Sequence, residues 1–411
     1  MKNFIKASIT YFILLSVLVT LLYEIGFTLN KSNCALLVKS KKNYYVYLKL
    51  FLDNFLFKKF DNFFLNEFKN CKCAAVVFLS YKDSFIFKKV YDYRLNKKEK
   101  INHETYFQIG SITKNFTAVS ILKLAEQNLI SLDDEIVKYI PELKINNVTI
   151  RNLLTHTSGF LNYQYLFEKI VKDKNVYLTN HDFLNYLLTL NRGLYFKKSL
   201  FNKYKYSNIG YVLLAIIVER VSGLTYKEFL KKNFFEKYSL NFLFYDDLIF
   251  NKKHDTINYA KPILEEGTEG INYFLNTIYG DKGIFSSVNE LYRWDTLLFN
   301  YYLLSKPFTD TMFNEYSMIK NSNLKYGFGW RITHLKNNSV SHKIIYHTGW
   351  WRGYQAILLN IPEEKLILIV LKNKYTKKTV INVNLFLRLF YNSNNFEIEN
   401  SNFCDDNSKD I

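Results

Sequence analysis

Proline and glycine are scarce in this chain, whose 411 residues include only 4 prolines and 14 glycines. This scarcity excludes long flexible linkers between separate modules. With 48% hydrophobic and 22% charged residues, the composition is that of a folded protein. At this length we expect a sizeable core, either in one large domain or in two closely joined lobes. The chain contains no internal repeat and no low-complexity segment.

Cysteine is also rare, with Cys34, Cys71, Cys73 and Cys404 the only four. None has the spacing of a zinc site, and we expect neither a metal nor another cofactor. A single residue between Cys71 and Cys73 makes a bond between these two awkward. We therefore expect free thiols, with a bridge from Cys34 to Cys71 or Cys73 as the alternative, because an exported compartment permits disulfides.

Acidic residues are outnumbered, since 37 Asp and Glu stand against 55 Lys and Arg and leave a net charge of +18. Such a charge can indicate a nucleic-acid partner or an anionic surface. The lysines are scattered, however, and Lys, Asn, Ile, Phe and Tyr are abundant together, as in A+T-rich coding. We therefore favour a solvated basic surface and expect no nucleic-acid partner. The charge would still favour carboxylate-rich material such as a cell-wall polymer.

Long hydrophobic runs are limited to the N-terminus, where Lys2 and Lys6 precede an uncharged run from Ala7 to Tyr23. This pattern is typical of a signal sequence or a marginal membrane span. Because no clear cleavage site follows, we expect residues 1–30 to be an uncleaved anchor, with a cleaved signal peptide as the alternative. The basic flank would place the following domain outside the cytoplasm, in the periplasm or cell envelope, or secreted after cleavage.

Apolar spacing predicts several elements in the first half of the chain. Residues 43–70 repeat apolar side chains at helical spacing, and residues 73–93 read as two strands around the turn "YKDS". A largely buried helix is expected from Ser111 to near Asn128. Ser131 and Asp134 then have the spacing of a capping box that would begin the next helix.

The second half changes from helical to strand periodicity. Residues 146–275 are mostly helical in pattern, with an apolar core helix that ends at Gly223 and a capping box at Thr225 and Glu228. Three apolar runs then predict an antiparallel meander, followed by a closing helix: 342–349, 354–360, 365–373 and 380–390. Residues 391–411 are polar and acidic, and we expect them to be disordered.

Strands at both ends, with helices between them, predict an α/β (α+β) fold. We expect a mixed lobe, with an antiparallel sheet flanked by helices, from residues of about 60–145 and 276–390. Residues of about 146–275 would form an all-α lobe.

Ser111 and Lys114 stand at i and i+3 at the start of a predicted helix, directly behind Gly110. A serine hydroxyl is a weak nucleophile unless a base removes its proton. Lysine serves as that base if burial or a neighbouring cation lowers its pKa. The same spacing occurs three more times without this context, at Ser120/Lys123, Ser317/Lys320 and Ser322/Lys325. The spacing alone therefore proves nothing.

Two further motifs are each unique in the chain. Tyr206-Ser207-Asn208 precedes the apolar core helix, where the phenol could transfer a proton and Asn208 could hold the lysine or the substrate amide. A helix cap beside a packed tyrosine is the ordinary alternative.

His347-Thr348-Gly349 ends an apolar strand, where backbone N–H groups could meet an incoming carbonyl. A histidine at the turn after a strand is the ordinary alternative.

Together and in this order, the three motifs resemble those of the penicillin-recognising serine hydrolases. The similarity is greatest to class C-type β-lactamases, D-alanyl-D-alanine carboxypeptidases and related esterases and D-aminopeptidases. It covers roughly residues 60–390 and implies a β-lactamase/transpeptidase-like fold, in a hydrolase domain within residues 31–390. Whole segments share it, namely 106–143, 148–160, 206–223 and 280–294.

The resemblance implies a role for each motif. Ser111 would form an acyl-enzyme, Lys114 and Tyr206 would handle protons, and Asn208 would orient the lysine and the substrate. The backbone N–H groups of Ser111 and Trp350 would form the oxyanion hole, with the His347-Thr348-Gly349 strand binding the substrate. Because the titrations of Lys114 and Tyr206 would be coupled, which of them is the base stays open.

Departures from the family pattern bear on the substrate. His347 stands where many β-lactamases have lysine, so a pH-dependent cation would replace a permanent one. In family terms this histidine is commoner in peptidases and esterases. Arg352 is a candidate for the missing carboxylate anchor, with plain surface exposure as the alternative. Trp350 and Trp351 would narrow the site, stack on the substrate or simply pack.

These patterns favour a membrane-anchored hydrolase of D-amino-acid peptides or amides, similar to D,D-carboxypeptidases. Its substrate would be a small peptide, amide or ester, with cell-wall material as one source. A β-lactamase, an esterase and a slow or non-catalytic penicillin-binding receptor are the alternatives. His156 and Ser158 suggest a triad, but the resemblance makes them structural. The chain has no Gly-x-Ser-x-Gly, His-Glu-x-x-His or phosphate-binding glycine motif.

Overall fold

A computed structural model describes residues 56–398, apart from 96, 98, 251–256, 271, 320–323, 338–339, 377–379 and 392–395. The chain divides into two units, residues 1–59 and 60–411. Of the first unit only the helical residues 56–59 are described, so the expected anchor, Cys34 and Cys404 lie outside the described residues. The fold described below is that of the second unit.

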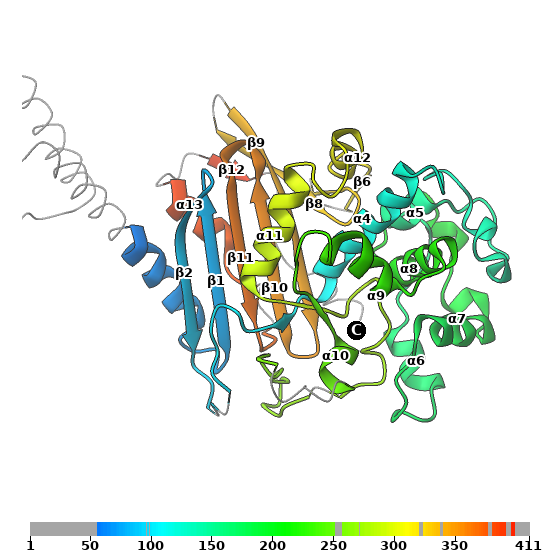
Figure 1. The fold of residues 1–411 in the computed structure, drawn as a ribbon, viewed down its shortest axis with the longest axis horizontal. Helices are drawn as coiled ribbons and strands as arrows, with labels where there is room; N and C mark the ends of the chain where they lie inside the picture. Colours follow the sequence, from blue (N-terminus) through cyan, green and yellow to red (C-terminus); the bar gives the residue numbers. More distant parts are fainter. Residues whose placement is uncertain are drawn as a thin grey trace, which may run out of the picture. The chain divides into compact units, whose positions relative to one another are not determined.

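One antiparallel sheet forms the centre of this unit, in the order β2-β1-β11-β10-β9-β8-β7-β6, with β12 beside β8 (Figure 1). Its strands are β1 Ala74–Tyr81, β2 Ser84–Asp92, β6 Ser317–Met318, β7 Lys325–Tyr326, β8 Arg331–Asn337, β9 Val340–Trp351, β10 Tyr354–Ile361, β11 Leu366–Lys372 and β12 Phe396–Ile398. The expected hairpin of β1 and β2 is confirmed, and so is the meander of β9, β10 and β11.

The sheet is covered on both faces, which explains why its central strands are rich in apolar residues on both sides instead of alternating. All eight residues of β10 are buried. Along β1, Val76 faces one apolar cluster, which includes Trp294, and Val77 faces another, which includes Phe64. Helix 60–68 and α13 (Val383–Tyr391) cover the second face, whereas α4 (Thr113–Glu126) and α11 (Val288–Phe299) cover the first.

The helices between the strands gather beside the sheet (Figure 1). They are α5 Ile150–Leu154, α6 Gln164–Ile170, α7 Asn180–Thr189, α8 Asn208–Ser222, α9 Tyr226–Leu230 and α10 Tyr245–Ile249. Between α11 and the later strands lies α12, Lys306–Met312. The core helix α8 ends at Gly223 in a left-handed conformation, and Thr225 and Glu228 form a capping box, as expected.

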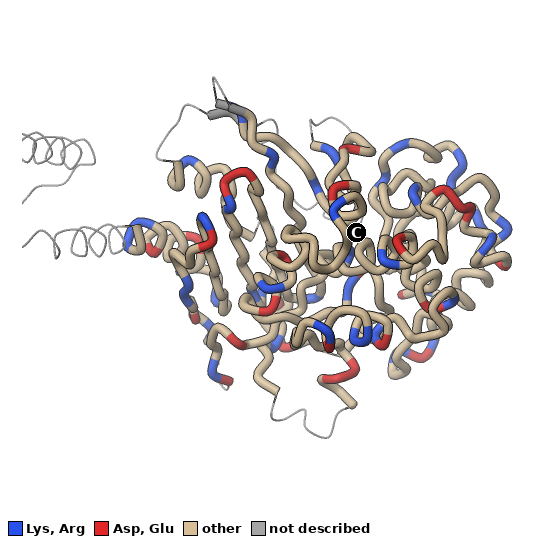
Figure 2. Tube along the Cα trace, turned by 45° about the horizontal axis from the view of Figure 1, so that its top comes forward, with Lys and Arg blue, Asp and Glu red and all other residues tan. Residues whose placement is uncertain are grey.

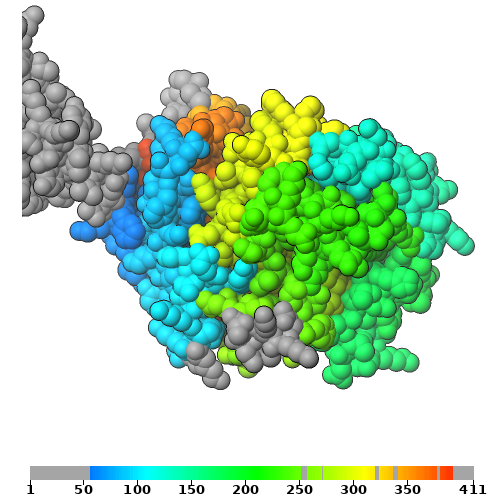
Figure 3. Space-filling view, in the orientation of Figure 1, coloured from blue at the N-terminus to red at the C-terminus, as the bar shows by residue number. Residues whose placement is uncertain are grey.

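A second sheet joins distant segments of the chain. It has the order β3-β5-β4, from Phe107–Gln108, Ile284–Ser286 and Leu243–Phe244. In the space-filling view, the middle of the chain (green) packs against the segment near residue 300 (yellow) (Figure 3). This second sheet brings the start of α4 close to the turn before β5, where the candidate site lies.

Lysine and arginine are spread over the described chain among aspartate and glutamate, with no face of one sign in the view of Figure 2. Among the residues from 56 to 398 that are described, no single helix is long and apolar enough to cross a membrane. One bent pair, Asn208–Ser222 with Tyr226–Phe235, meets the criteria of length and composition.

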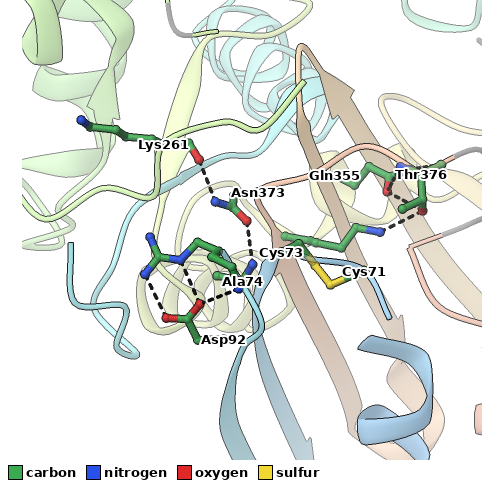
Figure 4. The surroundings of a disulfide bond; sticks show 10 residues. Cys71, Cys73, Ala74, Asp92, Lys261, Gln355, Asn373 and Thr376 are labelled. Atoms are coloured by element: carbon green, nitrogen blue, oxygen red, sulfur yellow. Dashed lines mark hydrogen bonds and ion pairs between the residues drawn. A yellow bond between two sulfur atoms is a disulfide. The ribbon is translucent and has the colours of Figure 1, made fainter. Parts of the chain in front are cut away.

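The expectation of free thiols is wrong for two cysteines, because Cys71 and Cys73 form a disulfide (Figure 4). Lys72 between them has a φ of 50°, and this left-handed turn brings the two Cα atoms to 5.2 Å, within reach of a disulfide. A one-residue gap is awkward only when the intervening backbone is extended.

Two further expectations differ from the structure. The Ser131 N–H donates to the Asp134 carboxylate, as in the expected capping box. However, only a short 3-10 turn, Ile136–Lys138, follows instead of a helix. Within the segment 391–411, residues 396–398 form β12 beside β8. Their partner strand supplies hydrogen bonds that the polar composition of the tail does not reveal.

Asp295 on α11 generates the first prediction. Its carboxylate is fully buried and accepts a bond of 2.6 Å from the Asn360 amide, yet burial raises its pKa to about 7. Because the folded pKa exceeds the unfolded value, this carboxyl stabilises the fold at low pH, and that contribution is lost as pH rises through about 7. Asp295→Asn should raise the free energy of unfolding at pH 8, by an amount on the order of 3 kcal/mol, and should change it little at pH 4.

Urea unfolding of both proteins across this pH range measures the effect. Asp310→Asn on α12 is the control, because its exposed ion pair with Lys306 should contribute little. An equal difference between Asp295→Asn and the unsubstituted protein at all pH values would contradict the prediction.

Candidate active site

Ser111 lies in a 3-10 turn, Gly110–Ile112, that leads directly into α4. Its side chain is only 5% exposed and lines a cavity of about 860 Å³. Gly110 has a φ of 52°, and a Cβ there would lie 2.6 Å from the backbone nitrogen of Trp350. A glycine is therefore required where the turn that carries Ser111 touches β9.

Lys114 follows one turn later and is fully buried. Its Nζ lies 3.0 Å from Ser111 Oγ, 2.8 Å from Asn208 Oδ1 and 3.0 Å from the carbonyl oxygen of Asp281. Burial lowers its pKa to about 7, helped by the nearby cations and opposed by Asp281. Near neutral pH a large fraction of this lysine is unprotonated, so it can accept the Ser111 proton.

The predicted Tyr206 and Asn208 lie beside this lysine. The Tyr206 ring centroid is 4.9 Å from Nζ, and Asn208 is the first residue of α8. The Asn208 N–H donates to Asn162 Oδ1 over 2.8 Å, and the Ser207 hydroxyl donates to the Leu161 carbonyl over 2.7 Å. These bonds fix the segment against the loop after α5.

His156 also holds the segment 205–207 in place. Its Nδ1 accepts the Ser207 N–H over 3.1 Å, its carbonyl accepts the Lys205 N–H over 2.8 Å, and its ring lies 4.3 Å from the Tyr206 ring. Burial lowers its pKa well below the usual value, as does the nearby Lys114 charge. His156, to which the resemblance assigns a structural role, is thus a neutral residue that packs against Tyr206.

His347 is not the pH-dependent cation that we expected. It is fully buried, and its Nδ1 lies 2.6 Å from the Thr348 carbonyl, which can only accept a hydrogen bond. The proton therefore sits on Nδ1, so in the neutral ring Nε2 accepts the Tyr326 hydroxyl over 3.1 Å. Burial holds its pKa well below the usual value, and Arg331 and Lys114 add to this effect. His347 thus lies behind the site and is neutral.

The strand edge at Gly349 and Trp350 packs directly on the turn that carries Ser111. A Cβ on Gly349 would overlap the Ile109 carbonyl oxygen and lie 3.4 Å from the Ser111 nitrogen. Trp351 and Tyr354 flank a two-residue hairpin turn, so Trp350, one position further from the turn, points its N–H away from β10. The backbone nitrogens of Ser111 and Trp350 both lie at this contact, and they stay the candidates for an oxyanion hole.

Arg352 and the two tryptophans line the cavity with Ser111. Arg352 occupies the hairpin tip with a φ of 34°, and its guanidinium carbon lies 4.1 Å from the Tyr273 ring centroid. The indole N–H of Trp351 donates to Asn276 over 2.6 Å. Thr348, by contrast, is buried within β9.

Asp281 and Lys282 are site residues that motif reasoning missed. The Lys282 ammonium is buried, donates to the Tyr163 hydroxyl over 2.8 Å, faces the Asp281 carboxylate at 3.5 Å and lies 4.6 Å from the Trp351 ring. The only signal was the likeness of residues 280–294 to a family segment, because an Asp-Lys pair between two glycines usually indicates an exposed turn.

The described residues include no group of three or more His, Cys, Asp or Glu side chains placed to hold a metal ion. The arrangement is instead suited to acyl transfer. A hydroxyl lies beside a lysine of lowered pKa, the strand edge at Gly349 and Trp350 packs against the turn that carries this hydroxyl, and a cavity opens beside them.

An antiparallel sheet with helices on both faces, with Ser-x-x-Lys at the head of a buried helix, defines a penicillin-recognising serine hydrolase fold. The profile of the family described as Beta-lactamase matches residues 74–389, and the chain belongs to this family.

Several known proteins are similar to this chain. Penicillin-binding protein 4* of Bacillus subtilis (strain 168) is 29% identical over 68% of this chain and 63% of its own length. Protein flp of Staphylococcus aureus (strain MW2) is 26% identical over 72% of this chain and 59% of its own length. The chain thus spans about three fifths of the length of these curated relatives.

Solved structures agree on the fold. The octameric penicillin-binding protein homologue from Pyrococcus abyssi matches with a TM-score of 0.68 and 26% identity, over 82% of this chain and 78% of that one. The D-amino acid amidase from Ochrobactrum anthropi SV3 matches with a TM-score of 0.63 over 78% and 93% of the two chains. At 18% identity the amidase shows a shared fold alone.

The contact at Gly349 generates the second prediction. Gly349→Ala should lower kcat/KM for p-nitrophenyl acetate about 100-fold or more, because the methyl group forces β9 away from Ser111 and separates the two N–H groups. Gly223→Ala at the end of α8 is the control. It should cost about 1 kcal/mol of stability, because its φ is 71°, but its Cβ would meet no atom within 4 Å, so activity should persist. Activity of Gly349→Ala within threefold of the unsubstituted protein would contradict the prediction.

Proposed function

We propose that the protein is a serine hydrolase that forms an acyl-enzyme through Ser111 and acts on D-amino-acid peptides or amides. The observation that carries the proposal is the buried Lys114, whose amine lies 3.0 Å from Ser111 Oγ and whose pKa is lowered to about 7. A base of this pKa is matched to neutral pH, where it takes the hydroxyl proton without a large energetic cost.

In the first half of the proposed reaction, neutral Lys114 takes the proton of Ser111 as Oγ bonds to the substrate carbonyl. The carbonyl oxygen becomes an oxyanion and accepts bonds from the N–H groups of Ser111 and Trp350. Collapse of this intermediate breaks the bond to the leaving amine or alcohol, which takes the proton from Lys114, directly or through Tyr206. The product is an ester on Ser111.

In the second half, water attacks this ester and the same groups move its proton. Water gives a proton to Lys114 as its oxygen bonds to the acyl carbon. The second intermediate collapses, Ser111 recovers a proton, and the carboxylic acid leaves. Asn208 holds the Lys114 amine throughout by its bond of 2.8 Å.

Three observations support the choice of substrate. Solved D-amino acid amidases share the fold, and penicillin-binding protein 4* shares 29% of its residues over the matched region. His347 is buried and neutral, so it provides no cation for a substrate carboxylate. Arg352 is a cation that lines the cavity with Ser111, and we assign it the role of anchoring such a group.

We also propose that the domain works outside the cytoplasm, anchored by its N-terminal segment, on small peptide, amide or ester substrates such as cell-wall material. The disulfide between Cys71 and Cys73 supports an oxidising compartment. The basic flank of the apolar run from Ala7 to Tyr23 supports the orientation.

Acylation of Ser111 is the third prediction. The purified protein should take up a fluorescent penicillin and should hydrolyse D-alanyl-D-alanine peptides or D-amino-acid amides. Ser111→Ala should lose the label, and its hydrolysis should fall by about 1000-fold or more, because the nucleophile is absent.

The matched control is Ser120→Ala, which removes the serine of the second Ser-x-x-Lys pair in the same helix, where the hydroxyl only bonds the Phe116 carbonyl. Equal labelling of Ser111→Ala and Ser120→Ala would contradict the assignment of Ser111 as the acylated residue. Label that is gained and rapidly lost would indicate a β-lactamase, whereas label without any hydrolysis would indicate a receptor.

The pH dependence of kcat/KM is the fourth prediction. Lys114 must be neutral to accept a proton, so with a non-ionising ester kcat/KM should fall about tenfold per unit below pH 7 and level off above it. Lys114→Arg should lose activity, because a guanidinium stays charged. Lys123→Arg, a change at the partly exposed lysine of the second pair, should keep the profile. A flat profile from about pH 5 to 8 would exclude Lys114 as the base.

A further inference from the structure

One side of the cavity is apolar and open to water. It is formed by Leu161, Tyr165, Leu166, Leu194 and Leu200, which we call the leucine wall. Tyr165 is 66% exposed and Leu194 is 50% exposed, although both line the cavity that contains Ser111. Apolar side chains gathered at the mouth of a cavity are typical of ligand-binding surfaces.

The leucine wall is tied to the candidate site by hydrogen bonds. The Leu161 carbonyl accepts the Ser207 hydroxyl, and its N–H donates to the Tyr195 carbonyl over 2.9 Å. Asn162, the next residue, accepts the Asn208 N–H. The wall therefore begins one residue from a group that holds Asn208, and its position relative to Lys114 is fixed.

Two short turns and one helix complete the wall. Leu194 ends the 3-10 turn Arg192–Leu194, and Leu200 ends the turn Lys198–Leu200. Tyr165 and Leu166 lie in the first turn of α6. Each of these elements is held by backbone bonds, such as Leu161 to Tyr195 and Lys197 to Gly159, so the wall is preformed.

Lys197, Lys205 and Arg352 are cations that line the cavity, whereas Asp281, Lys282 and Glu168 are paired with neighbouring groups. Lys282 faces Asp281 and donates to Tyr163, and Glu168 pairs with Lys174 and accepts the Tyr273 hydroxyl. Arg352 stacks on Tyr273. Asn162, Gln164 and Lys197 line the cavity among these residues, but the side chains of the leucine wall are themselves hydrocarbon and one phenol, which suits them to an apolar group. With about 860 Å³ the cavity is larger than a single small amino-acid amide needs.

We propose that the leucine wall is a binding subsite for an aliphatic or aromatic group attached to the ester or amide bond that Ser111 attacks. The inference rests on the proposed function, because it assumes that Ser111 reacts. Covering the wall removes its apolar surface and that of the ligand from water, and each methylene buried in this way strengthens binding about fourfold at most. The substrate class is therefore an acyl donor with a bulky apolar group.

Two series of esters test the subsite and show whether it binds the acyl group or the leaving group. The acyl series is p-nitrophenyl acetate, butanoate, hexanoate and octanoate. The leaving-group series consists of acetate esters of alcohols with the same chain lengths. We expect kcat/KM to rise about two- to fourfold per methylene in one series. A rise in the acyl series places the acyl group on the wall, and a rise in the other places the leaving group there.

Two matched variants distinguish binding at the leucine wall from a general effect of surface hydrophobicity. Leu194→Asn should lower the ratio of octanoate to acetate kcat/KM (or the matching ratio in the alcohol series) at least about tenfold. Leu129→Asn is the matched control, because Leu129 is 52% exposed after α4 and does not line the cavity. The free energy of unfolding of both variants should be close to that of the unsubstituted protein, since surface substitutions cost little.

Flat chain-length profiles in both series, or equal ratios in the two variants, would overturn the subsite. Hydrolysis of the acetate that depends on Ser111 would then leave the proposed function standing. If Ser111→Ala retains the activity of the unsubstituted protein, the proposed function fails first, and the subsite proposal falls with it.

Discussion

Burial of one ammonium group organises the site. The Lys114 amine contacts the Ser111 hydroxyl in the turn before its helix, an amide oxygen 94 residues away at Asn208 and a backbone carbonyl 167 residues away at Asp281. These oxygens compensate for lost water, but burial still lowers the pKa to about 7. The lysine is thus stable enough to be buried and basic enough to act. Each contact comes from a different part of the fold, so the helices, the sheet and the turn before β5 must all be in place.

The surroundings leave this lysine as the group that changes charge near neutral pH. His156 and His347 lie in the same buried cluster, and burial with nearby cations holds the pKa of each well below its usual value. Each imidazole instead serves as a neutral hydrogen-bond partner, His156 for Ser207 and His347 for Tyr326. A cluster with several charged histidines would repel the protonated Lys114 of the proposed acyl transfer.

Local patterns predicted most helices and strands well, but they predicted the oxidation state of the cysteines and the charge of a histidine poorly. The hairpin of β1 and β2, the core helix that ends at Gly223 and the helix that begins just after Ser111 follow from short-range spacing and turn chemistry. The disulfide of Cys71 and Cys73 was missed because it depends on the left-handed backbone of Lys72. The charge of His347 was misjudged because its burial depends on packing against Tyr326 and the distant Tyr206, which no local pattern reveals.

The amino-acid sequence by itself determined the order of the three motifs, the shared helix face of Ser111 and Lys114, and the family. The spacing of Ser111 and Lys114 is local, so helical periodicity applies to it directly, whereas the family follows from the resemblance of three motifs that stand far apart. Only the tertiary structure decided that Asp281 binds the lysine, that His347 is neutral behind the site and that a leucine wall opens beside Ser111. Desolvation, charge and cavity shape arise from segments that meet only after folding, so no local pattern contains them.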